Sequence, residues 1–181
     1  MAKTAEKLAE LMHFSPDECK KVLVAGYLHD IGKLTVDTAI LEKQSALDPS
    51  EFDIIKSHTY YTYYLLGGIT GLEDITTWAA YHHEKLNGKG YPFHIKGDSM
   101  NLCARILAVS DVFTALREKR PYKKPYTKEK ILSILKDMAD SGAIDSDVVG
   151  VLTDNYPVLE DACVQAEDSA REAYDRFYQI Q

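Results

Sequence analysis

The sequence predicts an all-α protein, built as a single-domain helical bundle. Apolar residues recur at intervals of three and four along most of the chain, whereas the alternation that marks β-strands is scarce. The length of 181 residues suits one domain with its own core. A composition that is 45% hydrophobic and 27% charged is typical of a globular chain and excludes the disordered and fibrous classes.

Membrane, secreted and disulfide-rich classes are also disfavoured. No run of about 18 uncharged apolar residues occurs, and the first residues, MAKTAEKLAELMHF, lack the apolar centre of a signal peptide. We therefore expect a cytoplasmic protein without a membrane segment. The three cysteines, Cys19, Cys103 and Cys163, lie far apart and form no CxxC pair, so we expect buried thiols rather than disulfides or a zinc knuckle.

The charge distribution argues against a general nucleic-acid binder, because the chain carries a formal net charge of −7. Residues 117–130 depart from this average, with seven basic and two acidic side chains. Runs of this kind are most often solvated faces. The stretch RPYKKPY within it also offers prolines that stiffen the chain, tyrosines that stack on bases and cations for phosphate. A local anion site therefore stays open as the alternative.

The first predicted helix begins at Ser15-Pro16-Asp17-Glu18. Ser15 suits the N-cap, Pro16 suits the first helical position, and Glu18 completes a capping box. The apolar stripe that follows runs as far as His29-Asp30. This pair is therefore expected at the C-terminal end of the helix.

A second helix is predicted from the same signal at Asp48-Pro49-Ser50-Glu51. It carries His58 and ends at Gly67-Gly68. Four tyrosines follow His58 on it, and we interpret them as core and interface packing rather than as a base-stacking surface: Tyr60, Tyr61, Tyr63 and Tyr64.

A third helix is expected from about Leu72 through His82-His83, until the glycine-rich stretch at Asn87 breaks it. Ser99 is expected to cap a fourth helix, on which Asp111 lies beside an apolar stripe. Residues 127–181 are typical of three further amphipathic helices. The last stretch, AEDSAREAYDRFYQIQ, is either an oligomer helix or a terminus docked on the rest of the protein.

Histidines and aspartates gather beside the apolar stripes of these helices. Buried ionisable groups are costly unless they are paired or bind a metal, so a set of this size predicts a metal site. Imidazole and carboxylate ligands without cysteine suit iron, manganese or zinc with positions open to water. Adjacent residues can reach one metal cluster only near a helix end, and both histidine pairs precede one. The expected ligands are His29, Asp30, His58, His82, His83 and Asp111.

Five elements together resemble the HD-GYP subgroup of the HD-domain metal-dependent phosphohydrolases. They are LHDIGK at 28–33, His58 on its own helix, HHE at 82–84, GKGYP at 88–92 and RILAVSDVFTAL at 105–116, in the order of the family. The resemblance treats 1–181 as one HD-GYP-like domain, with a tight match over residues 15–128 and a looser fit of the C-terminal helices over 129–181.

The resemblance implies a helical bundle that holds two or three divalent metal ions and hydrolyses cyclic di-GMP to pGpG, GMP or both. Iron or manganese is the expected metal, with zinc, nickel or cobalt as alternatives. Asp30 would bridge two metals and the hydroxide held between them would attack phosphorus. Lys33 would stabilise phosphate charge. Contacts with the dinucleotide fall, by the same resemblance, to Tyr91, Arg120 and Lys123.

Two further expectations concern Glu84 and the N-terminus. Glu84 follows His82-His83 and is expected to orient one of these histidines. In trinuclear family members, a glutamate and a histidine on an upstream helix add ligands, and those positions fall before Met1 when the chains are aligned on His29. The sequence is therefore interpreted either as part of a longer protein with a sensor or receiver domain, or as a chain with two metals.

Two classes of function remain open at this stage. One is the phosphodiesterase with cyclic di-GMP as substrate. The other is a catalytically weak or inactive HD-GYP-like module that senses a nucleotide or docks on a partner such as a diguanylate cyclase or a regulatory domain. A homodimer is compatible with either.

Overall fold

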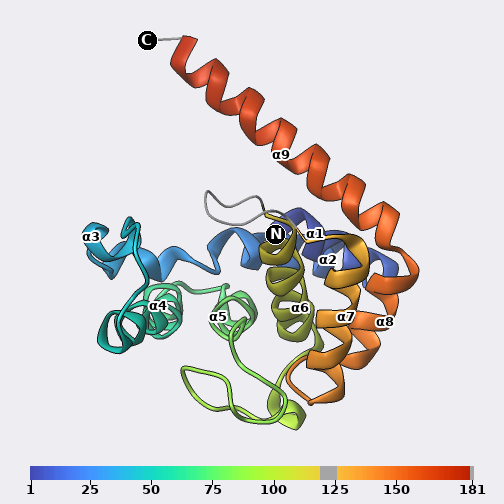
Figure 1. Cartoon of the computed structure of the whole chain (residues 1–181), viewed down its shortest axis with the longest axis horizontal. Helices are drawn as coiled ribbons and strands as arrows, with labels where there is room; N and C mark the ends of the chain where they lie inside the picture. The colour runs from blue at the N-terminus through green and yellow to red at the C-terminus, as the bar shows by residue number, and fades with distance from the viewer. Residues whose placement is uncertain (119–125, 180–181) are drawn as a thin grey trace.

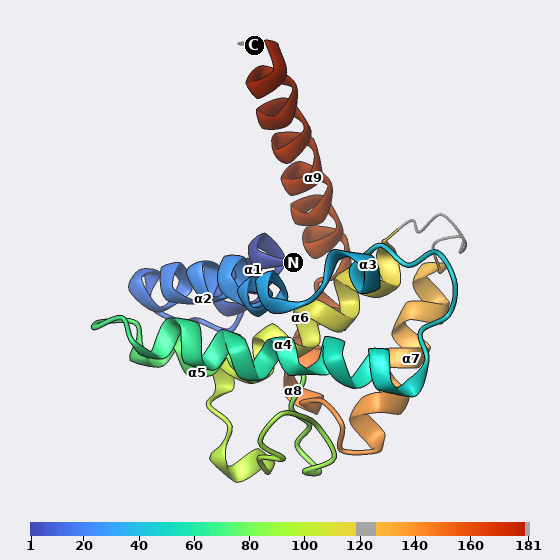
Figure 2. The same cartoon turned by 90° about the vertical axis from the view of Figure 1, so that its left-hand side faces the viewer.

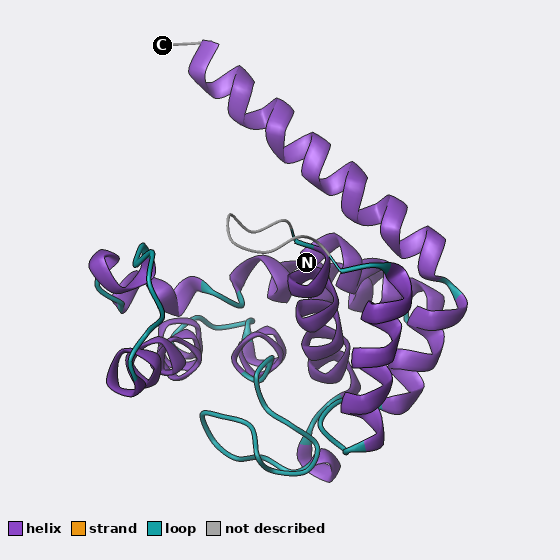
Figure 3. Cartoon of the chain, in the orientation of Figure 1, coloured by secondary structure: helices purple, strands orange, loops and turns teal. Residues whose placement is uncertain are grey.

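The computed structural model describes residues 1–118 and 126–179, which form helices, turns and loops (Figures 1 and 3). Within these ranges the only strand-like pairing is an isolated bridge between Asn87 and Lys96, so the predicted all-α fold is confirmed. None of the described helices combines the length and the apolarity needed to span a bilayer. The elements are α1 (Ala2–Leu11), α2 (Pro16–Leu28), η1 (Ile31–Thr35), α3 (Thr38–Leu41), α4 (Pro49–Gly67), α5 (Glu73–Ala80), η2 (Gly97–Ser99), α6 (Leu102–Arg117), α7 (Lys128–Asp140), α8 (Ser146–Asp154) and α9 (Tyr156–Gln179).

The starts of α2 and α4 agree with the sequence analysis. Ser15 and Asp48 each accept a hydrogen bond from a backbone amide three residues later, and Glu18 and Glu51 complete the two capping boxes. Each cap contributes about 1 kcal/mol to the stability of its helix. The capping signals thus define where the two helices begin that lead to the predicted ligands.

Two predicted boundaries were wrong. Asn101, not Ser99, caps α6, because its side chain accepts from the amide of Cys103 at 2.8 Å, while Ser99 ends the turn η2. Helix α5 ends at Ala80, so His82 and His83 lie on the turn that follows it. A turn allows two adjacent side chains to point to one place, which a continuing helix does not.

The core forms around α6, which packs against α1, α5, α7 and α8. Ile106, Val109 and Phe113 on α6 are fully buried, and Trp78 of α5 joins them in one cluster of buried apolar side chains. Figures 1 and 2 show α6 surrounded by these helices. Asp111 therefore projects from the central helix of the bundle.

The tyrosines of α4 do not belong to the core. Tyr60, Tyr61 and Tyr64 are exposed, and the rings of Tyr60 and Tyr64 lie 4.4 Å apart on the surface. The inner face of α4 is occupied instead by His58, Thr59, Thr62 and Leu66. The prediction of core packing was therefore wrong for these three tyrosines, because other side chains already fill the inner face of α4, whereas Tyr63 is half-buried. The predicted interface packing stays a prediction.

Only the first part of α9 docks on the bundle. Leu159 and Cys163 are buried, but from Glu167 to Gln179 the described side chains are exposed. Figures 1 and 2 show the helix leaving the body of the protein. A terminus docked along its whole length is therefore excluded for the described residues.

Candidate metal centre

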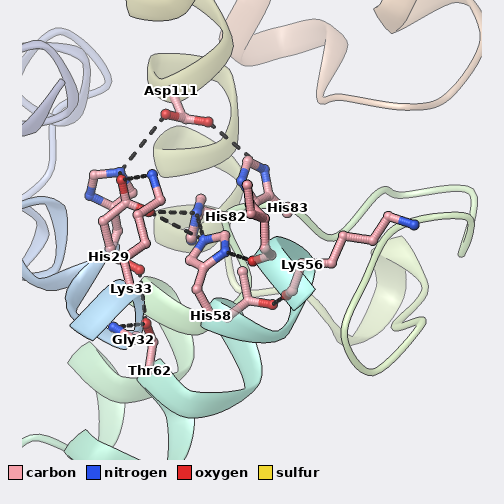
Figure 4. Close-up of polar contacts among 12 residues, drawn as sticks. His29, Gly32, Lys33, Lys56, His58, Thr62, His82, His83 and Asp111 are labelled. Carbon is pink, nitrogen blue, oxygen red and sulfur yellow. Dashed lines mark hydrogen bonds and ion pairs between the residues drawn. The ribbon is translucent and has the colours of Figure 1, made fainter. Parts of the chain in front are cut away.

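Six predicted ligands from four segments converge on one point (Figure 4). His29 and Asp30 lie where α2 ends, His58 lies on α4, His82 and His83 follow α5, and Asp111 lies on α6. Asp30 Oδ1 is 3.2 Å from His58 Nε2, and Asp30 Oδ2 is 3.3 Å from His29 Nε2. Asp111 spans the far side, 3.9 Å from His29 Nε2 and 3.8 Å from His83 Nδ1.

Two groups of these residues have the geometry to hold a metal ion. One is His58, His82 and His83, and the other is His29, Asp30 and His82; within each group the ligand atoms lie within 4.8 Å of one another. Asp30 also approaches His58 of the first group. Its carboxylate therefore lies between the two groups.

Backbone carbonyls select the ring nitrogens that face the centre. Nδ1 of His29 lies 2.8 Å from the carbonyl of Gly26, and Nδ1 of His58 lies 2.6 Å from that of Ile55. His82 repeats the arrangement with the carbonyl of Ala79 at 2.6 Å. A carbonyl only accepts, so each Nδ1 carries a proton, and Nε2 is the ring nitrogen left to bind at the centre.

A cation fits this donor set. The Nε2 atoms of His58 and His82 face each other at 3.3 Å, and two bare lone pairs at that distance repel unless a cation or a proton lies between them. Asp30 Oδ1 is buried without a hydrogen bond in the described part of the chain, which is costly for a carboxylate. Nitrogen and oxygen donors without sulfur suit divalent transition metals.

The pKa shifts of the cluster favour neutral imidazoles beside a carboxylate. Burial, followed by the neighbouring His58, lowers the pKa of His83 to about 3, and burial lowers the pKa of His82 well below its usual value. Burial alone would raise the pKa of Asp30, but His29, His58 and Lys33 outweigh it and hold that pKa well below its ordinary range. Burial raises the pKa of Asp111.

Lys33 lies beside the centre, as the sequence predicted. Its Nζ donates a 2.6 Å hydrogen bond to Asp30 Oδ2. The turn η1 that carries Lys33 begins directly after Asp30, which brings the two side chains next to each other. Lys33 remains partly exposed and can meet a ligand that approaches from solvent.

Thr62 is a residue that the sequence reasoning missed. Its Oγ1 donates to the carbonyl of His29 at 3.0 Å and accepts from the amide of Gly32 at 3.1 Å (Figure 4). Gly32 is pressed against α4, where a Cβ would lie 1.9 Å from the carbonyl oxygen of His58. The hydroxyl thus joins the turn of His29 and Asp30 to the helix of His58. The available signal was its position four residues after His58, on the same helix face.

Glu84 has a different role from the predicted one. Its Oε1 accepts from the amide of Phe93 at 2.6 Å and its Oε2 from that of Ile95 at 3.1 Å, so this buried carboxylate holds the following loop rather than orienting a histidine ring. Gly90 passes the same place so closely that a Cβ would lie 2.4 Å from Glu84 Cα. Glycine is required there by space, and at Gly88 by a φ of +74°.

The loop that Glu84 holds places Tyr91 at the edge of the centre. The amide of Tyr91 donates to the carbonyl of His83 at 3.2 Å, and the two rings lie 5.0 Å apart. Burial raises the pKa of Tyr91, so its hydroxyl stays protonated. The other two predicted substrate contacts, Arg120 and Lys123, lie outside the described residues.

Residues 1–148 match the family model described as the HD domain. The chain belongs to the HD domain family. This match confirms the HD-domain resemblance drawn from the motifs. A solved neighbour with the same fold is the HDG"Y"P protein Bd1817 from Bdellovibrio bacteriovorus. The two structures align with a TM-score of 0.65 at 16% sequence identity, and the alignment covers 86% of this chain and 51% of the neighbour's chain. At this identity the likeness shows the shared HD fold alone.

Two curated relatives extend the comparison. The chain is 34% identical over 155 residues to "3'3'-cGAMP-specific phosphodiesterase 1" of Vibrio cholerae, covering 86% of this chain and 36% of the relative. It is 34% identical over 168 residues to "Cyclic di-GMP phosphodiesterase response regulator RpfG" of Xanthomonas campestris, covering 91% of this chain and 44% of the relative. This HD domain chain thus spans less than half the length of either.

Removal of the Thr62 hydroxyl is expected to weaken metal binding. Thr62→Val leaves the His29 carbonyl and the Gly32 amide unpaired, so we expect about a tenfold or larger loss of affinity for Mn²⁺, the range found for groups that orient ligands. Thr59→Val is the matched control, because Thr59 is equally buried but donates within its own helix to Lys56. Calorimetric titration measures both, and Thr62→Ser should bind like the wild type. Equal affinities of the two valine variants would show that Thr62 only packs the core.

The metal-free protein is expected to lose stability as the pH falls from 7 to 5. His83 has a pKa near 6.5 when unfolded and about 3 when folded, so the unfolded chain binds more protons in this window and stability falls with the pH. One such histidine contributes at most about 1.4 kcal/mol per pH unit. Urea unfolding of chelator-treated protein measures the slope. His83→Gln should reduce the dependence of the unfolding free energy on pH, whereas His94→Asn, at an exposed site, should leave it unchanged. An unchanged dependence in His83→Gln would contradict the assignment of this effect to His83.

Proposed function

We propose that this chain is a metal-dependent phosphodiesterase that hydrolyses cyclic di-GMP to pGpG, GMP or both. The observation that carries the proposal is the position of Asp30, whose two oxygens face two groups of potential metal ligands. Curated relatives named as phosphodiesterases of cyclic dinucleotides support the reaction class.

In this proposal the chain holds two divalent ions, iron or manganese. His29, Asp30 and Asp111 would hold one ion, while His58, His82 and His83 would hold the other, and Asp30 would contribute to both. Ions bound there would act as Lewis acids and activate a water molecule for attack on phosphorus. The neutral state of His82 and His83 keeps their lone pairs available for this purpose.

Lys33 and Tyr91 complete the site from the chain itself. The Lys33 ammonium, next to Asp30 and partly exposed, is positioned to neutralise charge that develops on the phosphate oxygens. Tyr91 keeps its proton and can donate a hydrogen bond or stack on a base. These two residues therefore orient and stabilise a substrate rather than activate water.

Selection between cyclic dinucleotides must come from contacts away from the reacting phosphorus. The two relatives described above are named for different dinucleotides, although both are phosphodiesterases. We propose Tyr91, Arg120 and Lys123 for this recognition. Arg120 offers a planar pair of donors to a phosphate or to a guanine edge, an arrangement that lysine cannot reproduce.

A binding module is the second candidate function. The four side chains of Tyr60, Tyr61, Tyr64 and Phe93 form an exposed aromatic surface. It lies where α4 meets the loop that contains Phe93. Exposed aromatic clusters are typical of protein interfaces. A partner such as a diguanylate cyclase domain docking there would favour this role, and turnover of cyclic di-GMP by the isolated chain would exclude the inactive version.

Asp30→Ala is expected to remove more metal than His58→Ala. Asp30 borders both ligand groups, whereas His58 belongs to one. Elemental analysis should find two ions per chain in the wild type, about one in His58→Ala and close to none in Asp30→Ala, with turnover of cyclic di-GMP abolished in the latter. A wild type without metal after reconstitution with Fe²⁺ or Mn²⁺, or equal small losses in both variants, would contradict the proposed centre.

Arg120→Ala is expected to lower turnover of cyclic di-GMP at least tenfold, or about 1.5–3 kcal/mol for one charge-assisted hydrogen bond. Hydrolysis of bis-p-nitrophenyl phosphate should change little, because that ester lacks the guanine and the second phosphate that Arg120 is proposed to contact. Lys130→Ala, in the same basic stretch, is the matched control and should affect neither reaction. Equal losses with both substrates in Arg120→Ala would instead assign Arg120 to the metal centre or the fold.

A further inference from the structure

Helix α9 carries one continuous apolar stripe, only part of which is covered. Its first members, Leu159 and Cys163, are 0% and 4% exposed and pack against α1, where Cys163 Sγ lies 3.1 Å from Thr4 Oγ1. Ala166 is half-buried, Ala170 and Ala173 are exposed, and Phe177 is 60% exposed. The cover is lost because α9 leaves the bundle, as Figures 1 and 2 show.

The spacing of this stripe is that of a coiled coil. Its members follow one another at intervals of four, three, four, three and four residues, which is the repeat of positions a and d in a heptad. The opposite position of each heptad is an aspartate: Asp161, Asp168 and Asp175. The exposed part of α9 therefore has one apolar face suited to a partner helix and one polar face that meets water. The apolar face continues the face by which the start of α9 packs on α1.

The helix also borders a groove that matches its own tip. The groove, of about 640 Å³, lies between α9 and the helices α1 and α2, with Ala162, Ala166 and Ala170 on one wall and Tyr27, 65% exposed, on the other. Two ion pairs of α1, Lys3 with Glu6 and Lys7 with Glu10, form its polar rim. Small side chains along one wall leave room for a large apolar one.

The tip of the same chain cannot fill this groove. Phe177 lies eleven residues beyond Ala166 on one unbroken helix, which is about 16 Å along the axis. Phe177 and its neighbour Tyr174 remain exposed. A second copy presents the same aromatic tip on an equally free helix, and an antiparallel arrangement brings each tip to the groove of the other.

We propose that two copies of this chain form a dimer with two-fold symmetry through antiparallel pairing of α9. Phe177 of each copy packs against Ala166 of the other, and Ala170 packs against Ala173, so that large side chains meet small ones along the stripe. Such a self-complementary contact uses the same surface twice and closes on itself. The dimer does not depend on the proposed phosphodiesterase activity, because the metal centre lies in the body of the bundle.

Light scattering coupled to gel filtration tests the dimer on the full, metal-loaded chain. The expected mass is twice that of one chain at micromolar concentrations. Phe177→Glu should give the mass of a single chain, because it places a charge on the stripe. Tyr178→Glu is the matched control: Tyr178 is the next residue and 55% exposed, but it lies off the stripe, so the dimer should persist. Both side chains are exposed, so far-ultraviolet circular dichroism should show that both variants fold.

Cysteine crosslinking tests the direction of the pairing. Ala166→Cys combined with Phe177→Cys should form disulfide-linked dimers on mild oxidation, whereas Phe177→Cys alone should not, because the two tips lie far apart in the antiparallel pair. A single-chain mass up to about 100 μM, a dimer that survives Phe177→Glu, or crosslinking of Phe177→Cys alone would each overturn the proposal. The last result would mean parallel helices, and the second would place the dimer contact on another surface.

Discussion

The contact of the Asp30 carboxylate with His29, His58 and Lys33 is the interaction on which the rest of the site depends. A carboxylate that is partly buried must be compensated, and Lys33 compensates one of its oxygens. The other oxygen is buried without a hydrogen bond among the described residues and faces the Nε2 atoms of His58 and His82. A carboxylate and several nitrogen lone pairs this close together are stable only when cations balance the negative charge. Metal binding and the stability of this region are therefore coupled.

The second requirement of the site is accurate placement of short side chains, and the backbone provides it. Three histidines are held by carbonyls three residues earlier in the chain, which fixes both the ring orientation and the nitrogen that is free. The Thr62 hydroxyl joins the turn of His29 and Asp30 to α4. The Glu84 carboxylate ties the loop that contains Phe93 to the turn that carries His82 and His83. These connections are buried or partly buried, so the lowered dielectric around them strengthens them.

The surfaces around this rigid centre serve different purposes. The side of the candidate metal centre near Tyr91 and Lys33 carries polar groups, whereas the outer face of α4 and one stripe of the free part of α9 are apolar. Apolar side chains left in water at these two places lower the solubility of the monomer unless something covers them. The candidate metal centre thus lies in the bundle, while the exposed apolar surfaces lie on the helices at its edges, where we propose association.

The sequence by itself determined the helical class, the starts of α2 and α4 and the set of residues at the centre. These features depend on local patterns: capping boxes, apolar periodicity and ligand types placed just before helix ends. The tertiary structure decided the roles of Glu84 and Thr62, the exposure of the α4 tyrosines, the end of α5 and the departure of α9 from the bundle. A hydrogen-bond partner is chosen by which backbone groups come near, and an apolar side chain is buried only if another element covers it. Both depend on how distant segments pack, which no local pattern specifies.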